Sequence, residues 1–360
     1  MSRPNSPRSM PPPQSPDPDR APIFIVGSGR SGTSLLRAML NAHPRVHLLQ
    51  ESAFHTWTEM PGRWVDGARR LEFYYRSFSF AWLGLDPEEL RAIFPAPVPR
   101  EQLPQVYRAI MRRVAERHGK PRFGDKNPMS TVYLDRIFAG FPDARVVRMV
   151  RDPRGMLASF AGMPFPSPSI VFWGLLSRRG GRKLAPFLDR ILTIRMEDLM
   201  ADPRGTMAAV LDFVDEPWDD AVLDHPRHLV PDDGPPFPWA ADAYEPLRVR
   251  NPSWPRRLTP AQIRLIERLN RPLMRQFAYP PADLPAEPGA RQMARAVAAD
   301  VAREAAYLWR AARMVRRLFG RPPADAAEAQ RLLFGLNPAV REHHPDWSLP
   351  DPPALPGAGR

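Results

Sequence analysis

A short glycine- and serine-rich segment near the start of the chain has the composition of a phosphate-binding loop. Residues 27–34 read GSGRSGTS and separate the apolar run IFIV at 23–26 from a segment whose apolar residues recur at helical spacing. A loop between a buried strand and a helix directs backbone N–H groups and the positive end of the helix toward one point, which favours an anion. A Gly/Ser turn without a ligand is the alternative. A simple turn has no need for the cation Arg30 between the glycines.

Two common phosphate loops fit this segment poorly. A nucleoside-triphosphate P-loop places Lys directly after the second glycine of G-x4-G, but here Thr33 follows Gly32. The dinucleotide fingerprint fits Gly27 and Gly29, but the helix that follows starts with polar residues, and only Glu51 stands near the position of its acidic residue. A P-loop nucleotide kinase or other phosphotransferase is therefore the alternative function, and dinucleotide binding is a further one.

Charged residues also stand where other predicted strands end. Glu51 follows the apolar run at 46–49, and Arg151 follows the strand-like segment at 144–150. Open α/β sheets bind ligands at the carboxyl edge of their parallel strands, so we expect Glu51 at such an edge. An Asp-Pro pair directly after Arg151 is a good helix opening, with Asp as the N-cap and Pro in the first turn.

Two of these segments together resemble a known enzyme family. PIFIVGSGRSGTSLLRAMLNAHP at 22–44 is similar to the 5′-phosphosulfate loop of sulfotransferases that use 3′-phosphoadenylyl sulfate (PAPS), and RVVRMVRDPRGMLAS at 145–159 is similar to their 3′-phosphate site. Within that family the chain resembles the tyrosylprotein-sulfotransferase branch, because Glu51 lies 21 residues after Arg30 and Lys126 lies in a GDKNP segment before the second motif. The likeness extends over about residues 22–282. It implies a P-loop-like sulfotransferase fold.

The resemblance also implies roles for individual residues. Sulfuryl transfer from PAPS to a hydroxyl or amine would release 3′,5′-ADP, with Glu51 as the general base and with Arg30 and Lys126 neutralising charge on the bridging oxygen. The residues implied in donor binding are Gly29, Arg30, Ser31, Gly32, Thr33, Ser34, Arg151, Ser159, Arg250 and Ser253. A sulfuryl group carries one charge fewer than a phosphoryl group, so cations can replace magnesium, and we expect no metal.

Several of these roles have alternatives. His55 could replace Glu51 as the base, since cytosolic small-molecule sulfotransferases use a histidine. Glu51 could instead cap the next segment or pair with an arginine, and Lys126 could form a salt bridge with Asp125 beside it. Arg148 and Arg154 flank Arg151, and either fits a solvated surface charge. Near Arg250 and Ser253 the family's Arg-Lys-Gly pattern is absent.

The composition excludes several other classes of protein. The chain of 360 residues contains no cysteine, so disulfides, iron–sulfur clusters, cysteine zinc sites and cysteine nucleophiles are ruled out. Its apolar runs are far shorter than the roughly 18–20 residues of a membrane span. The formal charge of +12 suits an anionic partner, but the aromatic residues are not interleaved with basic ones, and we expect no nucleic acid.

Strands alternating with helices predict an α/β fold, with a parallel sheet flanked by helices. Strands are expected at 23–26, 46–49, 144–150 and 191–194, and the clearest helices at 104–118, 203–214 and 260–277. The 47 prolines are about 13% of the chain, against a usual ~5%. Part of this excess lies in two segments that we expect to be disordered, a leader at 1–21 and a tail at 346–360.

A catalytic domain is expected at 22–282, followed by a basic helical extension at 283–345. Within the extension, residues 290–319 place apolar residues three, four or seven apart and contain seven arginines against two acids. We expect this apolar stripe to pack on the catalytic domain. The alternative is peripheral contact with an anionic membrane.

The acceptor is not readable from these motifs. A small molecule, a glycan, a lipid or a peptide would each suit a glutamate base surrounded by cations. The first residues contain many prolines and lack the apolar core of a signal peptide. We therefore expect a cytoplasmic protein, with the membrane surface as the alternative location.

Overall fold

A computed structural model of the chain describes residues 21–59, 70–75, 77–160, 169–228, 238–248 and 252–320. The predicted leader, apart from its last residue, and the predicted tail at 346–360 lie outside these ranges, as does Arg250. The predicted boundary at residue 282 falls between the last two described helices, α14 (Arg271–Gln276) and α15 (Ala290–Gly320).

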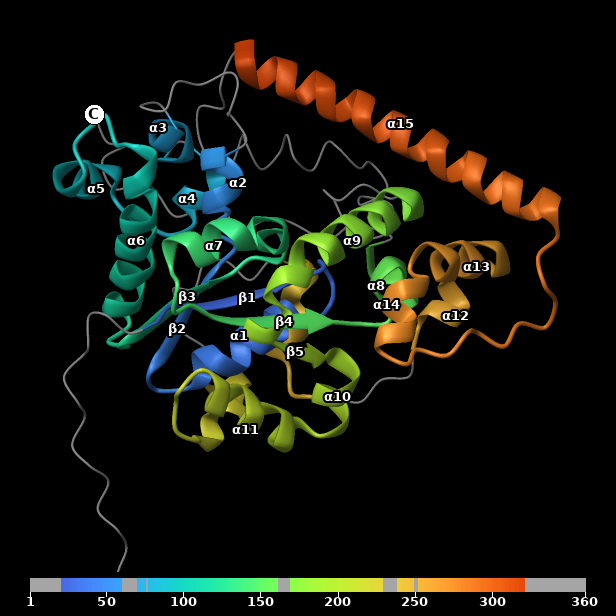
Figure 1. The fold of residues 1–360 in the computed structure, drawn as a ribbon, viewed down its shortest axis with the longest axis horizontal. Helices are drawn as coiled ribbons and strands as arrows, with labels where there is room; N and C mark the ends of the chain where they lie inside the picture. The colour runs from blue at the N-terminus through green and yellow to red at the C-terminus, as the bar shows by residue number, and fades with distance from the viewer. Residues whose placement is uncertain are drawn as a thin grey trace, which may run out of the picture.

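The centre of the molecule is a sheet of five parallel strands in the order β2-β3-β1-β4-β5. The strands are β1 (Ile23–Gly27), β2 (Val46–Gln50), β3 (Arg122–Lys126), β4 (Arg145–Val150) and β5 (Ile191–Arg195). Helices cover both faces of this sheet (Figure 1). The predicted α/β class and four predicted strands are therefore confirmed, and β3 is a strand that the sequence analysis missed.

The missed strand β3 contains mostly polar residues, although all of its residues are buried. It lies between β2 and β1 and reads RFGDK. A Cβ atom at Gly124 would lie 1.8 Å from the carbonyl oxygen of Ile23, so only glycine lets β1 approach this closely. Its charged side chains are partnered inside the protein, for example Arg122 with Glu216 at 3.0 Å. A buried strand of this kind lacks the apolar pattern by which strands are recognised.

Alternating residues of the strands contribute to two separate cores, because successive side chains of a strand point to opposite faces. Phe24 and Val146 pack under α6 (Leu103–Arg117) and α7 (Leu134–Gly140). On the opposite face, Ile25 and Val147 pack with α1 (Thr33–Ala42), α10 (Met196–Ala201) and α11 (Pro203–Phe213).

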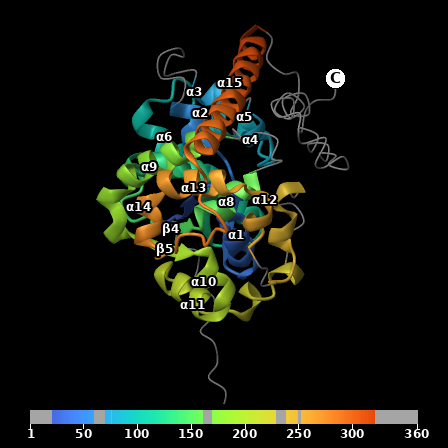
Figure 2. The same cartoon turned by 90° about the vertical axis from the view of Figure 1, so that its right-hand side faces the viewer.

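A third layer covers the carboxyl end of β4. It consists of α8 (Pro153–Phe160), α9 (Ile170–Leu184), α13 (Pro260–Leu269) and α14, which lie side by side in Figure 2. Met156, Phe160 and Ile266 form its apolar core. The remaining elements are α2 (Phe54–Glu59), α3 (Arg70–Tyr75), α4 (Phe78–Ala81), α5 (Pro87–Ile93), α12 (Trp254–Arg257) and the 3₁₀ helices η2 (Arg100–Gln102), η3 (Pro128–Tyr133), η4 (Ala185–Arg190), η5 (Asp220–Val222), η6 (His225–Arg227) and η7 (Pro238–Tyr244).

The basic helix predicted at 290–319 is present as α15, a helix of 31 residues that lies outside α9 and α13 (Figure 1). The fully buried carboxylate of Asp300 accepts hydrogen bonds at the start of α9, from Ser169 Oγ at 2.7 Å and from two backbone N–H groups. Met293 packs on the third layer, whereas Leu308 and Trp309 are more than half exposed. Val297 and Val301 of the same stripe are also exposed, at 37% and 53%, so the expected packing is found at Met293 and not at Val297, Val301 or Leu308. Contact with a membrane stays a prediction.

No described helix combines the length and apolar character needed to cross a membrane.

Candidate functional site

The glycine-rich loop connects β1 to α1 at the carboxyl edge of the sheet. Gly32 is the N-cap of α1 and has a φ angle of 97°, a conformation that favours glycine. A Cβ atom there would lie 2.4 Å from the sulfur of Met196. Because this N-cap has no side chain, no side-chain hydrogen bond caps the helix. The first N–H groups of α1 therefore present a positive helix end to the site.

Arg30 joins the loop to the second motif. Its Nε donates a hydrogen bond to Ser159 Oγ at 3.0 Å, and Arg151 Nη1 donates to the Arg30 carbonyl oxygen at 3.1 Å. The structure thus brings Arg30 together with two predicted site residues that lie more than 100 positions later in the sequence. Burial lowers the pKa of both guanidinium groups, and the charge of Arg151 lowers the pKa of Arg30 further, against the opposing effects of Asp242 and Glu51. Two guanidinium groups held this close favour a multiply charged anion.

Lys126 and Glu51 form an ion pair at the ends of β3 and β2. Lys126 Nζ lies 2.6 Å from Glu51 Oε1 and 3.3 Å from Ser34 Oγ at the start of α1. The lysine side chain is fully buried, whereas the glutamate side chain is 35% exposed. Burial lowers the pKa of Lys126, and the charge of Glu51 acts in the opposite direction. Among the described residues Glu51 Oε2 has no hydrogen-bond donor, so this oxygen can accept a proton from a bound molecule.

The sequence suggested a salt bridge between Asp125 and Lys126. In the structure, the carboxylate of Asp125 forms its hydrogen bonds with other residues. It accepts hydrogen bonds from Tyr107 OH at 2.6 Å and from Ser52 Oγ at 2.7 Å. Burial raises the pKa of Asp125, and these hydrogen bonds lower it. Ser52 directly follows Glu51, whose φ of 53° is unusual for a residue other than glycine. The Asp125 cluster therefore holds the backbone beside Glu51.

His55, the alternative base, lies in a hydrophobic environment. Its ring packs edge-on against Phe54 and Tyr107 and is 8% exposed. Burial lowers its pKa to about 4. The His55 ring is enclosed by aromatic side chains, whereas the Glu51 side chain is 35% exposed beside the start of α1, so the geometry favours Glu51 as the base.

The later donor-binding residues are only partly described. Ser253 is exposed and is the N-cap of α12, a helix that contacts α8, which carries Ser159. No bond between Ser253 and the loop is found among the described residues, and Arg250 lies outside them. The two arginines that flank Arg151 are buried, which corrects their interpretation as surface charges. Arg154 pairs with Asp152 and Glu267.

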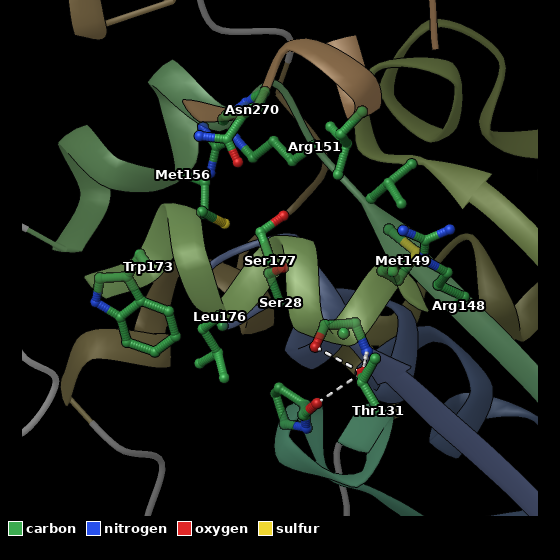
Figure 3. Close-up of a pocket in the computed structure, with 18 of the residues that line it drawn as sticks. Ser28, Thr131, Arg148, Met149, Arg151, Met156, Trp173, Leu176, Ser177 and Asn270 are labelled. Carbon is green, nitrogen blue, oxygen red and sulfur yellow. Dashed lines mark hydrogen bonds between the residues drawn. The ribbon is translucent and has the colours of Figure 1, made fainter. Parts of the chain in front are cut away.

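A pocket lies beside the loop, between β4, η3, α9 and α14 (Figure 3). Its wall includes the start of the loop and Arg151, together with Arg148, Trp173 and Asn270, to which the sequence analysis assigned no site role. The one sequence signal was Arg148, a charged residue in the interior of a strand whose other interior residues are apolar. No group of His, Asp and Glu that could hold a metal ion is found in the described part of the chain.

Comparison with known proteins finds similarity to sulfotransferases. A family model described as "Sulfotransferase family" matches residues 22–220. The chain is 29% identical over 230 residues to the protein-tyrosine sulfotransferase of Drosophila melanogaster, covering 60% of this chain and 42% of that protein. It is 28% identical over 214 residues to protein-tyrosine sulfotransferase 1 of Danio rerio, covering 56% and 55%. The chain thus spans about half the length of these relatives.

Among solved structures, the sulfotransferase domain from the Synechococcus PCC 7002 olefin synthase superposes with a TM-score of 0.44 at 22% identity, over 79% of this chain and 97% of that domain.

Proposed function

The chain belongs to the sulfotransferase family, and from that premise we propose that it transfers a sulfuryl group from PAPS to a hydroxyl or amine acceptor, releasing 3′,5′-ADP. The observation that carries this proposal is the convergence of Arg30, Arg151 and Ser159 at the uncapped start of α1. These groups come from the two motifs that would bind the two phosphate ends of the donor.

The donor would contact both motifs, the loop with Arg30 and the pair of Arg151 and Ser159. The loop N–H groups and Arg30 suit the phosphosulfate, because a helix start and a cation both stabilise an oxyanion. Arg151 and Ser159 suit the 3′-phosphate. Ser159 Oγ accepts a hydrogen bond from Arg30 Nε, which leaves its own proton for donation to a phosphate oxygen.

Glu51 and Lys126 would carry the chemistry. The acceptor oxygen or nitrogen forms a bond to sulfur as the bond between sulfur and the bridging oxygen breaks, and the bridging oxygen keeps the electron pair. Glu51 takes the acceptor proton on its carboxylate, for which Oε2 is available. Lys126 lies beside Ser34 at the start of α1, where a positive charge offsets the charge that builds on the departing oxygen.

For the acceptor, we propose a tyrosine hydroxyl of a protein or peptide as the first candidate to examine. The support is the names of the relatives, several of which are protein-tyrosine sulfotransferases. Small-molecule, glycan and lipid hydroxyls are the other candidates. The side chains of the described site restrict none of them.

Donor specificity tests the proposal without knowledge of the acceptor. We expect 3′,5′-ADP to raise the melting temperature of the full chain, whereas ADP and ATP with or without Mg²⁺ do not. The variant R151M should lose this shift, and R179A, which removes an exposed arginine of α9, should keep it. A larger shift with ATP and Mg²⁺ would favour the phosphotransferase alternative. No selective shift with 3′,5′-ADP would contradict the donor.

A further inference from the structure

The pocket beside the loop contains a buried cation that has no ion-pair partner in the described part of the chain. Arg148 lies on β4 and lines the pocket. It is 8% exposed, and its one interaction among the described residues is with the ring of Phe277, 5.5 Å from the guanidinium carbon. Burial alone lowers its pKa to about 10, so the group keeps its charge at neutral pH. A buried charge without a partner is costly for a folded protein.

The other buried arginines show that this arrangement is unusual for the chain. Arg37, Arg122, Arg148 and Arg154 are the arginines that are more than nine-tenths buried in the described part of the chain. Arg37 donates to Leu48 O and Gln50 Oε1, Arg122 pairs with Glu216, and Arg154 pairs with two carboxylates. Three of the four arginines therefore have hydrogen-bond or ion-pair partners within the chain. Arg148 instead faces a cavity.

A second polar group on the same pocket has one atom that lacks a hydrogen-bond partner among the described residues. Asn270, at the start of α14, is 2% exposed, and its Nδ2 donates to the carbonyl oxygen of Ile266 at 3.0 Å. Its Oδ1 is buried and accepts no hydrogen bond from the residues that the structure describes. A buried acceptor of this kind normally has a donor. The pocket therefore offers a cation for an anion and an acceptor for an O–H or N–H group.

The walls between these two groups are mainly apolar. Ser28 and Ser177 line the pocket together with the side chains of Met156, Trp173 and Leu176 (Figure 3). An aromatic side chain and aliphatic neighbours favour an apolar body over a bare inorganic ion. A guanidinium binds a carboxylate with two parallel hydrogen bonds.

We propose that this pocket is a binding site for an organic acid that has a carboxylate at one end, an apolar or aromatic body, and an O–H or N–H donor at the other end. The carboxylate pairs with Arg148, and the donor bonds to Asn270 Oδ1. The site does not include the Glu51–Lys126 pair and does not rest on the proposed function, but Arg151 also lines it, so the pocket borders the proposed donor site. Its occupant would touch the start of the donor loop, because Gly27, Ser28 and Gly29 form part of the wall.

Calorimetry on the full chain with 4-hydroxyphenylacetate tests the site directly. We expect saturable binding. The alcohol 4-hydroxyphenylethanol, which lacks the carboxylate, and the variant R148M should each weaken binding about tenfold or more. Phenylacetate, which lacks the hydroxyl group, should bind about threefold to tenfold more weakly. No binding of 4-hydroxyphenylacetate, equal binding of the alcohol, or tighter binding of sulfate would each overturn the proposal.

Thermal unfolding without any ligand provides a second test. R148M removes an unpartnered buried charge, so we expect its melting temperature to equal or exceed that of the wild type. The matched variant R154M breaks two ion pairs and should melt at a lower temperature. A strongly destabilised R148M would show that Arg148 is structural and would overturn the proposal. Retention of the 3′,5′-ADP shift by R148M, with its loss in R151M, separates this site from the donor site.

Discussion

Lys126 and Arg148 are both buried cations on strands of the same sheet, but they differ in the groups that lie next to them. Lys126 on β3 has the carboxylate of Glu51 at 2.6 Å and the hydroxyl group of Ser34 at 3.3 Å. Arg148 on β4 has an aromatic ring at 5.5 Å and no carboxylate among the described residues. A cation that the chain neutralises can be held in place for chemistry, whereas a cation without an internal partner is suited to bind an anion from solution.

The two cations also differ in what surrounds them. The Glu51–Lys126 pair is open on the glutamate side, where about one-third of the side chain is exposed, so one carboxylate oxygen can meet a bound acceptor. Arg148 lies deeper along its strand, inside a pocket with mainly apolar walls. Substitutions of Glu51, Lys126 and Arg148 can therefore distinguish a catalytic pair from a ligand-binding site.

The largest expected effect comes from removing the base of the partnered pair. E51Q keeps the shape of the side chain but cannot take a proton, so we expect the turnover number for sulfuryl transfer to fall about 10²–10⁴-fold. Initial rates with PAPS and a phenolic acceptor measure this. H55F should stay within about tenfold of the wild type, because the His55 ring is buried among aromatic side chains. Wild-type turnover by E51Q would refute the role of Glu51.

The next effect concerns stability and contrasts the two cations directly. K126M leaves Glu51 without its partner, so we expect a loss of about 3 kcal/mol in the free energy of unfolding, at the low end for a buried pair because Glu51 is partly exposed. Urea unfolding measures this value. The double variant E51Q/K126M should recover part of the loss, since it removes both charges. An unchanged stability of K126M, together with a destabilised R148M, would reverse the comparison.

A smaller effect is a pH dependence that arises from a buried neutral group. The pKa of His55 is about 4 in the folded protein, against about 6.5 when unfolded, so the unfolded chain binds the proton more readily. The stability due to neutral His55 is complete above about pH 6.5 and is lost as the pH falls toward 4, by about 2 kcal/mol between pH 7 and pH 5. H55F should show a correspondingly weaker loss over this range. Equal pH dependence of both proteins would contradict the burial of His55.

The smallest expected effect tests the cluster that holds the backbone beside Glu51. Y107F removes one hydrogen bond to the buried carboxylate of Asp125 and should cost about 1–2 kcal/mol in stability. Y75F is the matched control, since the buried hydroxyl group of Tyr75 has no partner in the described part of the chain. If Y107F also lowers the turnover number while the affinity for 3′,5′-ADP is unchanged, Tyr107 is a positioning residue for Glu51. Equal effects of Y107F and Y75F on stability would contradict the role of this bond.

Much of the fold could be predicted because its signals are local. The strand at 23–26, the glycine-rich loop and the helix that follows were readable from apolar spacing and glycine positions, and the structure places them as β1, the loop and α1. The meeting of Arg30 with Arg151 and Ser159 followed from a resemblance to a family. Local spacing alone would not have joined residues more than 100 positions apart.

The missed features share one physical cause. Strand β3 was not recognised because a strand with polar residues can be buried only where its side chains find partners, and those partners come from distant segments such as β2 and α6. The sequence suggested Asp125 as the ion-pair partner of Lys126, whereas the structure pairs Lys126 with Glu51, which follows the neighbouring strand. Adjacent strand residues point to opposite faces, which directs Asp125 toward Tyr107 instead.

The sequence by itself determined the alternation of strands and helices, the anion-binding loop and the types of side chain near it, because these depend on local periodicity and on the conformational freedom of glycine. Only the tertiary structure decided which buried charges are neutralised within the chain. The partner of Lys126, and the lack of an ion-pair partner for Arg148 among the described residues, depend on contacts between distant segments. In a protein interior those contacts determine whether a charge stabilises the fold, performs chemistry or binds a ligand.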